Sequence, residues 1–251
     1  MLLAIDIGNT NISCGIFKKS RLIKQFDIFT KYRFDTAFSK KFKNTTKISA
    51  IIICSVVPAQ TGIIFRKLAY LTGKTPYIIG KDLTVPIKNL YHKPGQVGQD
   101  RLVNAYAANI LYQSPLIVID SGTAITFDVI SKNKEYLGGL IFPGMGISLR
   151  SLKENTALLP LVELGNPRAL IGKNTRDSIL SGIVFGTAEL CGGLIQRIKR
   201  DIGKTPLVIG TGGDICRIKK YCKTNIKVDK DLTLKGICLI YENKIKESIR
   251  P

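Results

Sequence analysis

Apolar residues at the start of the chain fall into short runs separated by polar turns, a pattern typical of strands. Met1 to Ile7 is apolar except for Asp6, and a second run extends from Ile12 to Phe17. Two such runs joined by a Gly-Asn-Thr-Asn segment predict two antiparallel strands with a tight turn. Arg21 to Ile28 is predicted to add a third strand to the same meander.

The rest of the first half alternates between strands and helices. Ile48 to Val57 is almost continuously apolar, which predicts a strand buried on both faces of a sheet. Pro58 is expected near the start of a helix that ends at about Leu71. The other predicted elements are a weakly patterned helix over 30–42, a short strand over 75–79, an irregular stretch over 80–97, and a helix over 98–112 with one apolar face.

The opening pattern then repeats. Leu116 to Gly122 (LIVIDSG) aligns without gaps on Leu2 to Gly8 (LLAIDIG), so the chain is expected to have two halves of similar α/β build. We place the boundary near Ser114, giving domains 1–114 and 115–251. The second half is predicted to contain strands over 126–130, 136–142 and 207–209, helices over 145–153 and 175–201, and short elements from there to the end.

Composition fits a globular protein with a large core: 251 residues, 45% hydrophobic, with a positive mean hydropathy. No uninterrupted apolar run approaches the length of a membrane span. The N-terminus lacks a charged segment followed by a long apolar core, so no signal peptide is expected and a cytoplasmic location is predicted.

The formal net charge of +20 suggests an anionic partner, but the basic residues occur in small scattered groups. Solvated lysines with nonspecific attraction to polyanions are the simpler interpretation. Six cysteines form no CxxC pair, and His92 is the only histidine. A zinc cluster and a Ser-His-Asp hydrolase are therefore both disfavoured.

The repeated Asp-x-Gly turn is the leading candidate for chemistry. Gly8 allows backbone N–H groups to approach an anion closely, and Gly122 offers the same in the second copy. Asp6 and Asp120 could hold the cations that neutralise phosphate. Two such turns across an interdomain cleft would suit phosphoryl transfer. The alternative is a pair of ordinary hairpins.

Two further stretches allow both a functional and a structural interpretation. In Gly98-Gln99-Asp100-Arg101, Asp100 is either a base for an acceptor hydroxyl, with Arg101 binding an anionic group, or half of a surface ion pair. The glycines of 138–144 permit either ligand contact or close packing and a sharp turn. Gly212-Gly213-Asp214 is left outside the candidate site.

Taken in order, these motifs resemble the type III pantothenate kinases, within the superfamily of acetate and sugar kinases, Hsp70 and actin. The matching segments span nearly the whole chain: Asp6 to Thr10, Tyr91 with Pro94 and Gly98 to Arg101, Asp120 to Thr126, Gly138 to Gly144, Thr156 to Pro160, and Ile171 to Thr175.

The resemblance implies two ribonuclease-H-like domains of the actin-like ATPase fold, with an interdomain cleft. It also implies ATP-dependent phosphorylation of pantothenate to 4'-phosphopantothenate, the first step towards coenzyme A. Mg²⁺, a monovalent cation (K⁺ or NH₄⁺) and a homodimer are implied as well. The implied residues are Asp100 as base; Asp6, Ile7, Gly8, Asn9, Thr10, Asn11, Ile12, Ser13 and Thr123 for ATP; Tyr91, Gly98, Gln99, Asp100, Arg101 and Thr175 for pantothenate; Asp120 for the monovalent cation; and Asp6 for Mg²⁺ through water.

Three alternatives remain at this stage. Relatives described as transcription accessory factors make a DNA-associated regulatory protein the main one, although no membrane or specific nucleic-acid partner is expected. A kinase acting on a sugar or a small acid is the second. An ATPase without an acceptor is the third, and the short chain disfavours it.

Overall fold

The computed structural model describes residues 1–30, 34–41 and 47–249, and the chain divides into two compact units. The first comprises Met1–Leu111 with Asp231–Pro251, and the second is Tyr112–Lys230. The division after Leu111 lies close to the boundary expected near Ser114. The C-terminal segment, however, packs in the first unit, whereas the sequence placed it in the second half.

The first unit is built on a five-stranded sheet whose meander was predicted. The strand order is β3-β2-β1-β4-β5, with β1–β2 and β2–β3 antiparallel and β4 and β5 parallel to β1. The strands are β1 (Leu2–Ile7), β2 (Asn11–Lys18), β3 (Arg21–Phe29), β4 (Ala50–Ser55) and β5 (Tyr77–Ile78). Each predicted strand of this half is thus present, with β5 shorter than expected.

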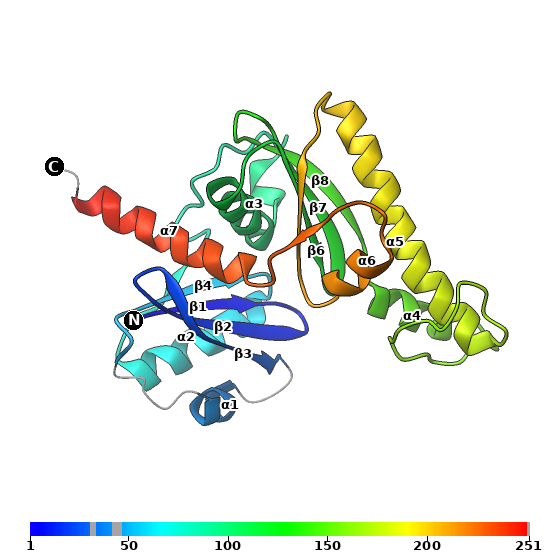
Figure 1. Cartoon of the computed structure of the whole chain (residues 1–251). Helices are drawn as coiled ribbons and strands as arrows, with labels where there is room; N and C mark the ends of the chain where they lie inside the picture. Colours follow the sequence, from blue (N-terminus) through cyan, green and yellow to red (C-terminus); the bar gives the residue numbers. More distant parts are fainter. Residues whose placement is uncertain (31–33, 42–46, 250–251) are drawn as a thin grey trace. The chain divides into compact units, whose positions relative to one another are not determined.

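Helices cover both faces of this sheet (Figure 1). One face carries Ile5 and Ile53 and packs against α1 (Phe34–Lys41) and α2 (Pro58–Thr72). The helix predicted over 30–42 includes α1, but positions 31–33 and 42 lie outside the described residues. A short 3-10 helix, η2 (Pro94–Gln96), interrupts the irregular stretch before α3.

The other face packs against α3 (Gln99–Leu111) and α7 (Leu232–Ile249), which contact each other. Burial of α3 extends beyond the one apolar face that the sequence predicts, because every residue from Arg101 to Asn109 is buried, including polar side chains such as Asn104.

The short elements expected at the C-terminus are replaced by α7, a helix of 18 residues. Its β-branched residues and Gly236 weaken a sequence-based helix prediction. The structure explains the glycine: a Cβ at Gly236 would lie 2.7 Å from the Val103 carbonyl oxygen and 2.7 Å from its Cγ1. A small residue is needed where α7 crosses α3.

The second unit repeats the first. Its strand order, β10-β9-β6-β7-β8, corresponds strand for strand to β5-β4-β1-β2-β3, with the same parallel and antiparallel pairs. The internal repeat in the sequence is therefore a repeat in structure. The elements are β6 (Leu116–Ser121), β7 (Ala124–Ile130), β8 (Tyr136–Pro143), α4 (Met145–Glu154), α5 (Thr175–Asp201), β9 (Leu207–Thr211), α6 (Ile215–Tyr221) and β10 (Lys227–Val228).

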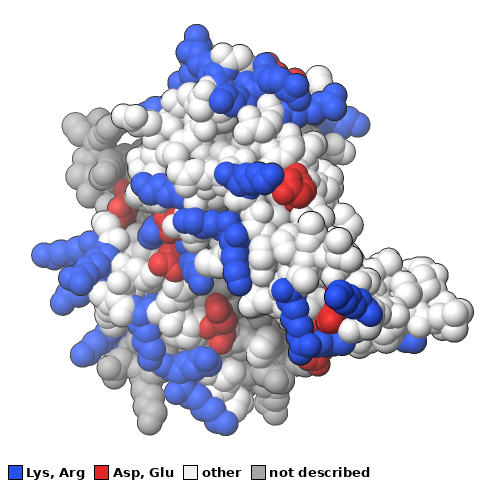
Figure 2. Space-filling model, turned by 45° about the vertical axis from the view of Figure 1, so that its right-hand side comes forward, with Lys and Arg blue, Asp and Glu red and all other residues white. Residues whose placement is uncertain are grey.

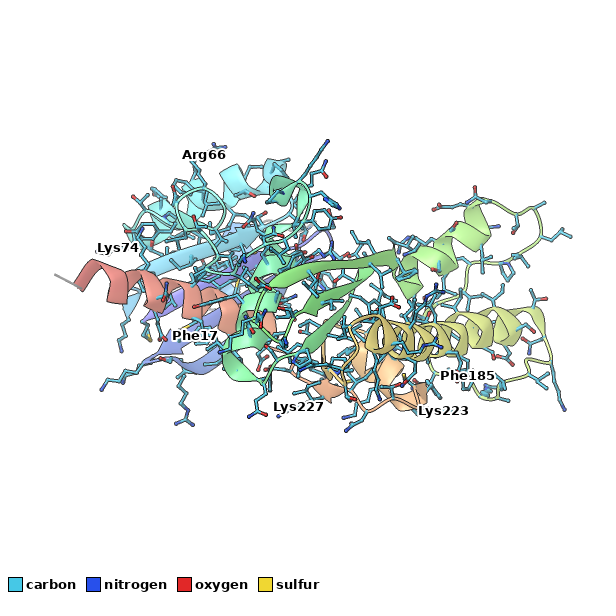
Figure 3. All side chains as sticks on the ribbon, turned by 90° about the horizontal axis from the view of Figure 1, so that it is seen from above. Phe17, Arg66, Lys74, Phe185, Lys223 and Lys227 are labelled. Atoms are coloured by element: carbon cyan, nitrogen blue, oxygen red, sulfur yellow. The ribbon has the colours of Figure 1, made fainter. Side chains whose placement is uncertain are left out.

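Among the described residues, α5 is the one helix long and apolar enough to cross a membrane by length and composition, with a hydropathy of 1.6 over 18 residues. One side of α5 is packed, because Val184, Cys191 and Ile195 belong to the core beneath the second sheet, although 39% of that window is buried in all. Phe185 of α5, labelled in Figure 3, also makes an edge contact with Tyr221 at 4.7 Å between ring centroids. We therefore interpret α5 as a core helix.

Candidate functional site

The first Asp-x-Gly turn is held in shape by backbone bonds and by the end of β3. The N–H of Gly8 donates to the carbonyl of Asn11 at 2.9 Å. Thr30 braces the same turn, since its hydroxyl donates to the Gly8 carbonyl and its N–H donates to the Thr10 carbonyl, both at 2.9 Å. Asn9, Thr10 and Asn11 are exposed at the tip. A fixed turn with exposed polar groups is suited to hold an anion.

Two of the predicted ATP-binding residues, Ile7 and Ile12, differ from the others in that their side chains are buried. The side chains of Ile7 and Ile12 are buried, at 0% and 1% exposure, in the core of the first unit. Only their backbone groups are therefore available to a ligand, while the side chains anchor the turn.

A row of polar side chains crosses the first sheet beside the turn. Asp6 on β1 pairs with Ser13 on β2, which pairs with Asp27 on β3. The Ser13 hydroxyl donates to Asp27 Oδ1 at 2.7 Å. No sequence motif marks Asp27 in β3; its register opposite Ser13 makes it a further candidate.

Asp100 lies in the first turn of α3 and shares its surroundings with Asp6. Burial and the negative charges of Asp6 and Asp100 together raise the pKa of the Cys54 thiol, so both carboxylates act on the same buried side chain. Burial also raises the pKa of Asp100 itself, opposed by the Arg101 N–H and by the Arg101 guanidinium. The Arg101 N–H donates to Asp100 Oδ1 at 2.9 Å. A carboxylate with a raised pKa is a stronger base.

The segment before Asp100 is closely packed around glycines. A Cβ at Gly98 would lie 2.5 Å from Asp100 Oδ1, and one at Gly80 would lie 2.8 Å from the Gln99 side chain. Gly98 therefore leaves room for the Asp100 carboxylate. Tyr91 is half-buried in the irregular stretch, and its N–H is held by Asn89 Oδ1 at 3.0 Å.

In the second unit, the start of α4 abuts the second Asp-x-Gly turn. Gly144 donates its N–H to the Thr123 carbonyl at 3.0 Å, and a Cβ there would come within 2.2 Å of the Gly122 carbonyl oxygen. The N-terminal end of a helix favours negative charge. This contact favours the close-packing interpretation for Gly144.

Gly212, which the sequence analysis left outside the site, lies directly against Asp120. Its φ is +88°, and a Cβ would fall 2.4 Å from Asp120 Oδ1 and 2.4 Å from the Ser121 carbonyl oxygen. Asp214 joins the same region, because its N–H donates to the Ser121 carbonyl at 2.9 Å. The Asp120 carboxylate and the Ser121 carbonyl, oxygens of the kind that bind hard cations, therefore pack against Gly212, where a larger residue would not fit.

Thr175 begins α5 and is exposed. The preceding Asn174 caps the helix, its Oδ1 accepting the Asp177 N–H at 2.8 Å. No cluster of three or more His, Cys, Asp or Glu side chains occurs in 1–30, 34–41 and 47–249. A metal ion here would therefore need ligands beyond such a cluster, such as phosphate oxygens, water or backbone carbonyls.

Two units with this strand order and a repeated Asp-x-Gly turn define an actin-like ATPase fold, and the solved structures agree. A protein from Campylobacter jejuni named as a conserved Baf family transcriptional activator superposes with a TM-score of 0.63 at 23% identity, covering 97% of this chain and 99% of that one. The activator of 2-hydroxyisocaproyl-CoA dehydratase from Clostridium difficile, solved with ADPNP, gives 0.59 at 13% identity, covering 100% and 98%. At these identities the likeness establishes the fold alone.

Sequence comparison identifies the family. The sequence profile of the type III pantothenate kinase family matches residues 2–197. Named type III pantothenate kinases from Persephonella marina and Citrifermentans bemidjiense are 40% and 38% identical, each over 96% of this chain and 98% and 99% of their own lengths. The chain belongs to the type III pantothenate kinase family.

Proposed function

We propose that this protein phosphorylates the primary hydroxyl of pantothenate with ATP, yielding 4'-phosphopantothenate in the first step of coenzyme A biosynthesis. Membership of the family over nearly the full chain carries this conclusion. The transcription-accessory alternative is not favoured, since the likeness to the Baf-named structure, at 23% identity, is one of fold.

Asp100 is the proposed base. Its half-buried carboxylate has a raised pKa, which suits removal of the acceptor's proton as the phosphoryl group is transferred. Gly98, Gln99, Arg101, Tyr91 and Thr175 are proposed to contact pantothenate, with the Arg101 guanidinium matching its carboxylate.

The two Asp-x-Gly turns are proposed to bind ATP, through residues 6–13 in the first unit and Thr123 in the second. Asp6 would hold Mg²⁺ through water, which offsets the charge on the phosphates. Asp120 is proposed to hold K⁺ or NH₄⁺, supported by the carboxylate and carbonyl oxygens that meet at Gly212.

A homodimer is proposed, and an exposed apolar surface supports it. Large apolar side chains are exposed in β8 and in the connection from α4 to α5: Ile141 at 63%, Leu158 at 93%, Leu161 at 61%, Leu170 at 66% and Ile171 at 78%. The face of the protruding end at the right of Figure 2 shows few Lys and Arg side chains. Apolar surface of this kind marks contact sites between proteins.

A cytoplasmic location without a specific nucleic-acid partner is also proposed. Lys and Arg lie in separate groups on the face shown in Figure 2, instead of forming one continuous stripe. This distribution fits nonspecific attraction to polyanions.

The deciding experiment measures ADP release from ATP and Mg²⁺ with and without pantothenate, in K⁺ and in Na⁺ buffers. Release that requires both pantothenate and K⁺ is expected. Release without pantothenate would indicate an ATPase or another acceptor, and equal rates in Na⁺ would remove the monovalent-cation proposal. Absence of ADP release from folded protein would favour the alternative of a DNA-associated regulatory protein.

A further inference from the structure

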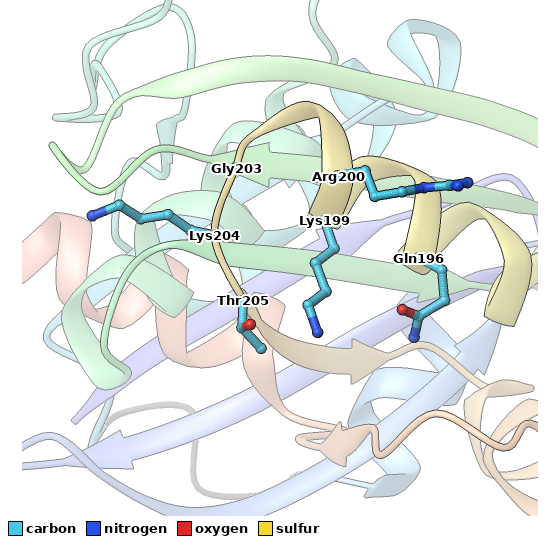
Figure 4. A pocket seen from close by; sticks show the side chains of 6 residues that line it. All are labelled: Gln196, Lys199, Arg200, Gly203, Lys204 and Thr205. Carbon is cyan, nitrogen blue, oxygen red and sulfur yellow. The ribbon is translucent and has the colours of Figure 1, made fainter.

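A hollow of about 570 Å³ lies at the C-terminal end of α5, where the chain turns towards β9. This volume is within the range of small-molecule sites. Six residues line it, shown in Figure 4: Gln196, Lys199, Arg200, Gly203, Lys204 and Thr205. We call it the α5 pocket.

The lining of the α5 pocket is cationic. Lys199, Arg200 and Lys204 contribute three positive charges, and none of the described residues that line the pocket has a carboxylate. Within the part of the chain that the structure describes, none of the three forms an ion pair. Gln196 and Thr205 add neutral hydrogen-bonding groups. Figure 4 shows their side chains on the same side of the chain as Lys199, with Lys204 extending to the left and Arg200 to the right.

The end of α5 and the turn that follows it bring the lining residues of the α5 pocket together. Lys199 and Arg200 occupy the last turn of α5, where cations offset the negative end of the helix dipole. That role does not account for Lys204 and Thr205, which follow the helix. Gly203, with a φ of +64° and its N–H donated to the Arg200 carbonyl at 3.2 Å, turns the chain so that they line the same hollow.

The α5 pocket is separate from the candidate site within the second unit. The 27 residues of α5 place the pocket about 40 Å from Thr175, at 1.5 Å of rise per residue. It also adjoins the segment that enters β9 at Leu207, whereas Gly212 follows the opposite end of that strand.

We propose that the α5 pocket binds a small anion carrying two or more phosphate groups, at a site distinct from the kinase site. Three cations that form no ion pair with any described residue match the charge of such a ligand better than that of a monophosphate. Arg200 can bind phosphate oxygens in pairs, while the lysines act as point charges. Gln196 and Thr205 would hydrogen-bond the remaining oxygens.

Isothermal titration of the full chain with inorganic tripolyphosphate tests this proposal, with Mg²⁺ omitted to weaken phosphate binding at the kinase site. The test variant is Lys199→Ala with Lys204→Ala. The matched control is Lys132→Ala with Lys153→Ala, which removes the same charge from exposed positions of the same unit. We expect at least about a tenfold rise in Kd for the test variant and less than about twofold for the control, because direct contacts resist the screening that weakens distant charges. Lys199→Arg with Lys204→Arg should retain binding.

Several results would overturn the proposal. Equal weakening in the test and control variants would mean general attraction to a cationic protein. Absence of tripolyphosphate binding to the unmodified chain, or equal affinity for monophosphate, would remove the ligand class. A single-stranded oligonucleotide that binds more tightly and depends on the same two lysines would indicate a nucleic-acid surface. Pantothenate-dependent ADP release should be unchanged in all variants. The test of the α5 pocket therefore succeeds or fails independently of the proposed kinase activity.

Discussion

The two units have the same strand order and register, yet their polar groups differ at equivalent positions. In the first sheet, the row that begins at Asp6 continues through Ser13 to Asp27. In the second, the equivalent row begins at Asp120 and continues through Thr126 to Ile141, which is 63% exposed. A carboxylate in one copy is thus an exposed apolar side chain in the other.

The turns differ as well. Four residues separate the last paired residues of the first hairpin, Ile7 and Ile12, whereas three separate Ser121 and Ile125 in the second. Thr30 braces the longer turn, while the shorter one is packed against Gly144, at the start of α4. The shared strand pairing places both turns at the same point of the framework, whereas the side chains at matching positions give each turn different neighbours.

Substitution of Asp100 is expected to have the greatest effect on turnover, and Asp100 has no counterpart among the candidate residues of the second unit. Asp100→Asn should lower kcat by about 10²–10⁴, the usual contribution of a general base, while leaving the Kd for ATP nearly unchanged. Steady-state kinetics and nucleotide binding measure the two quantities. Asp201→Asn, at an exposed position, serves as control. Equal losses of ATP binding and turnover would place Asp100 at the nucleotide instead.

The second prediction targets the crowding that is particular to the second turn. Gly212→Ala should destabilise the fold by about 1–3 kcal/mol, because its positive φ strains an L-residue and its Cβ would collide with Asp120 Oδ1. It should also reduce the proposed activation by K⁺. Gly213→Ala is the matched control, since a Cβ there meets nothing within 4 Å. Urea unfolding of both variants decides, and equal stabilities would contradict the close approach.

Most of the framework could be predicted from the sequence, because strand patterns and turn residues are local. The repeat of LLAIDIG as LIVIDSG located both central strands and both turns. The long C-terminal helix α7 was not predicted, because its sequence depends on tertiary packing. Gly236 is needed where Val103 lies against α7, and no local sequence pattern indicates that contact. The placement of α7 in the first unit likewise depends on packing.

The candidate site likewise contains residues that local sequence indicates and residues that only the structure indicates. Asp6, Asp100 and Asp120 could be proposed from the sequence because glycines lie close to them along the chain. Asp27 and Gly212 become candidates only through their neighbours in the structure: Ser13 for Asp27, and Asp120 for Gly212. Register across the strands, which a single sequence does not state, is the missing information.

The third prediction tests whether the polar row in the first sheet acts as a unit. Asp27→Ala should raise the KM for ATP by about fivefold with little change in kcat, because loss of one hydrogen bond to Ser13 amounts to about 1 kcal/mol. Ser13→Ala should have a similar effect, and the double variant should add little to either. Additive effects would show that the two side chains act independently. The equivalent substitution Ile141→Ala should leave the KM for ATP unchanged.

The smallest expected effect concerns stability, and it connects the burial of Asp100 with pH. The folded protein holds the Asp100 proton more tightly than the unfolded chain does, because burial raises its pKa. Its contribution to stability therefore falls as pH rises from about 4, the ordinary value, through the raised pKa. Asp100→Asn removes this cost, so the variant should melt slightly above the unmodified protein at neutral pH, with the difference narrowing towards about pH 4. Melting curves across that range measure it. A variant less stable at neutral pH would mean that the contacts of the ionised carboxylate with Arg101 outweigh its burial.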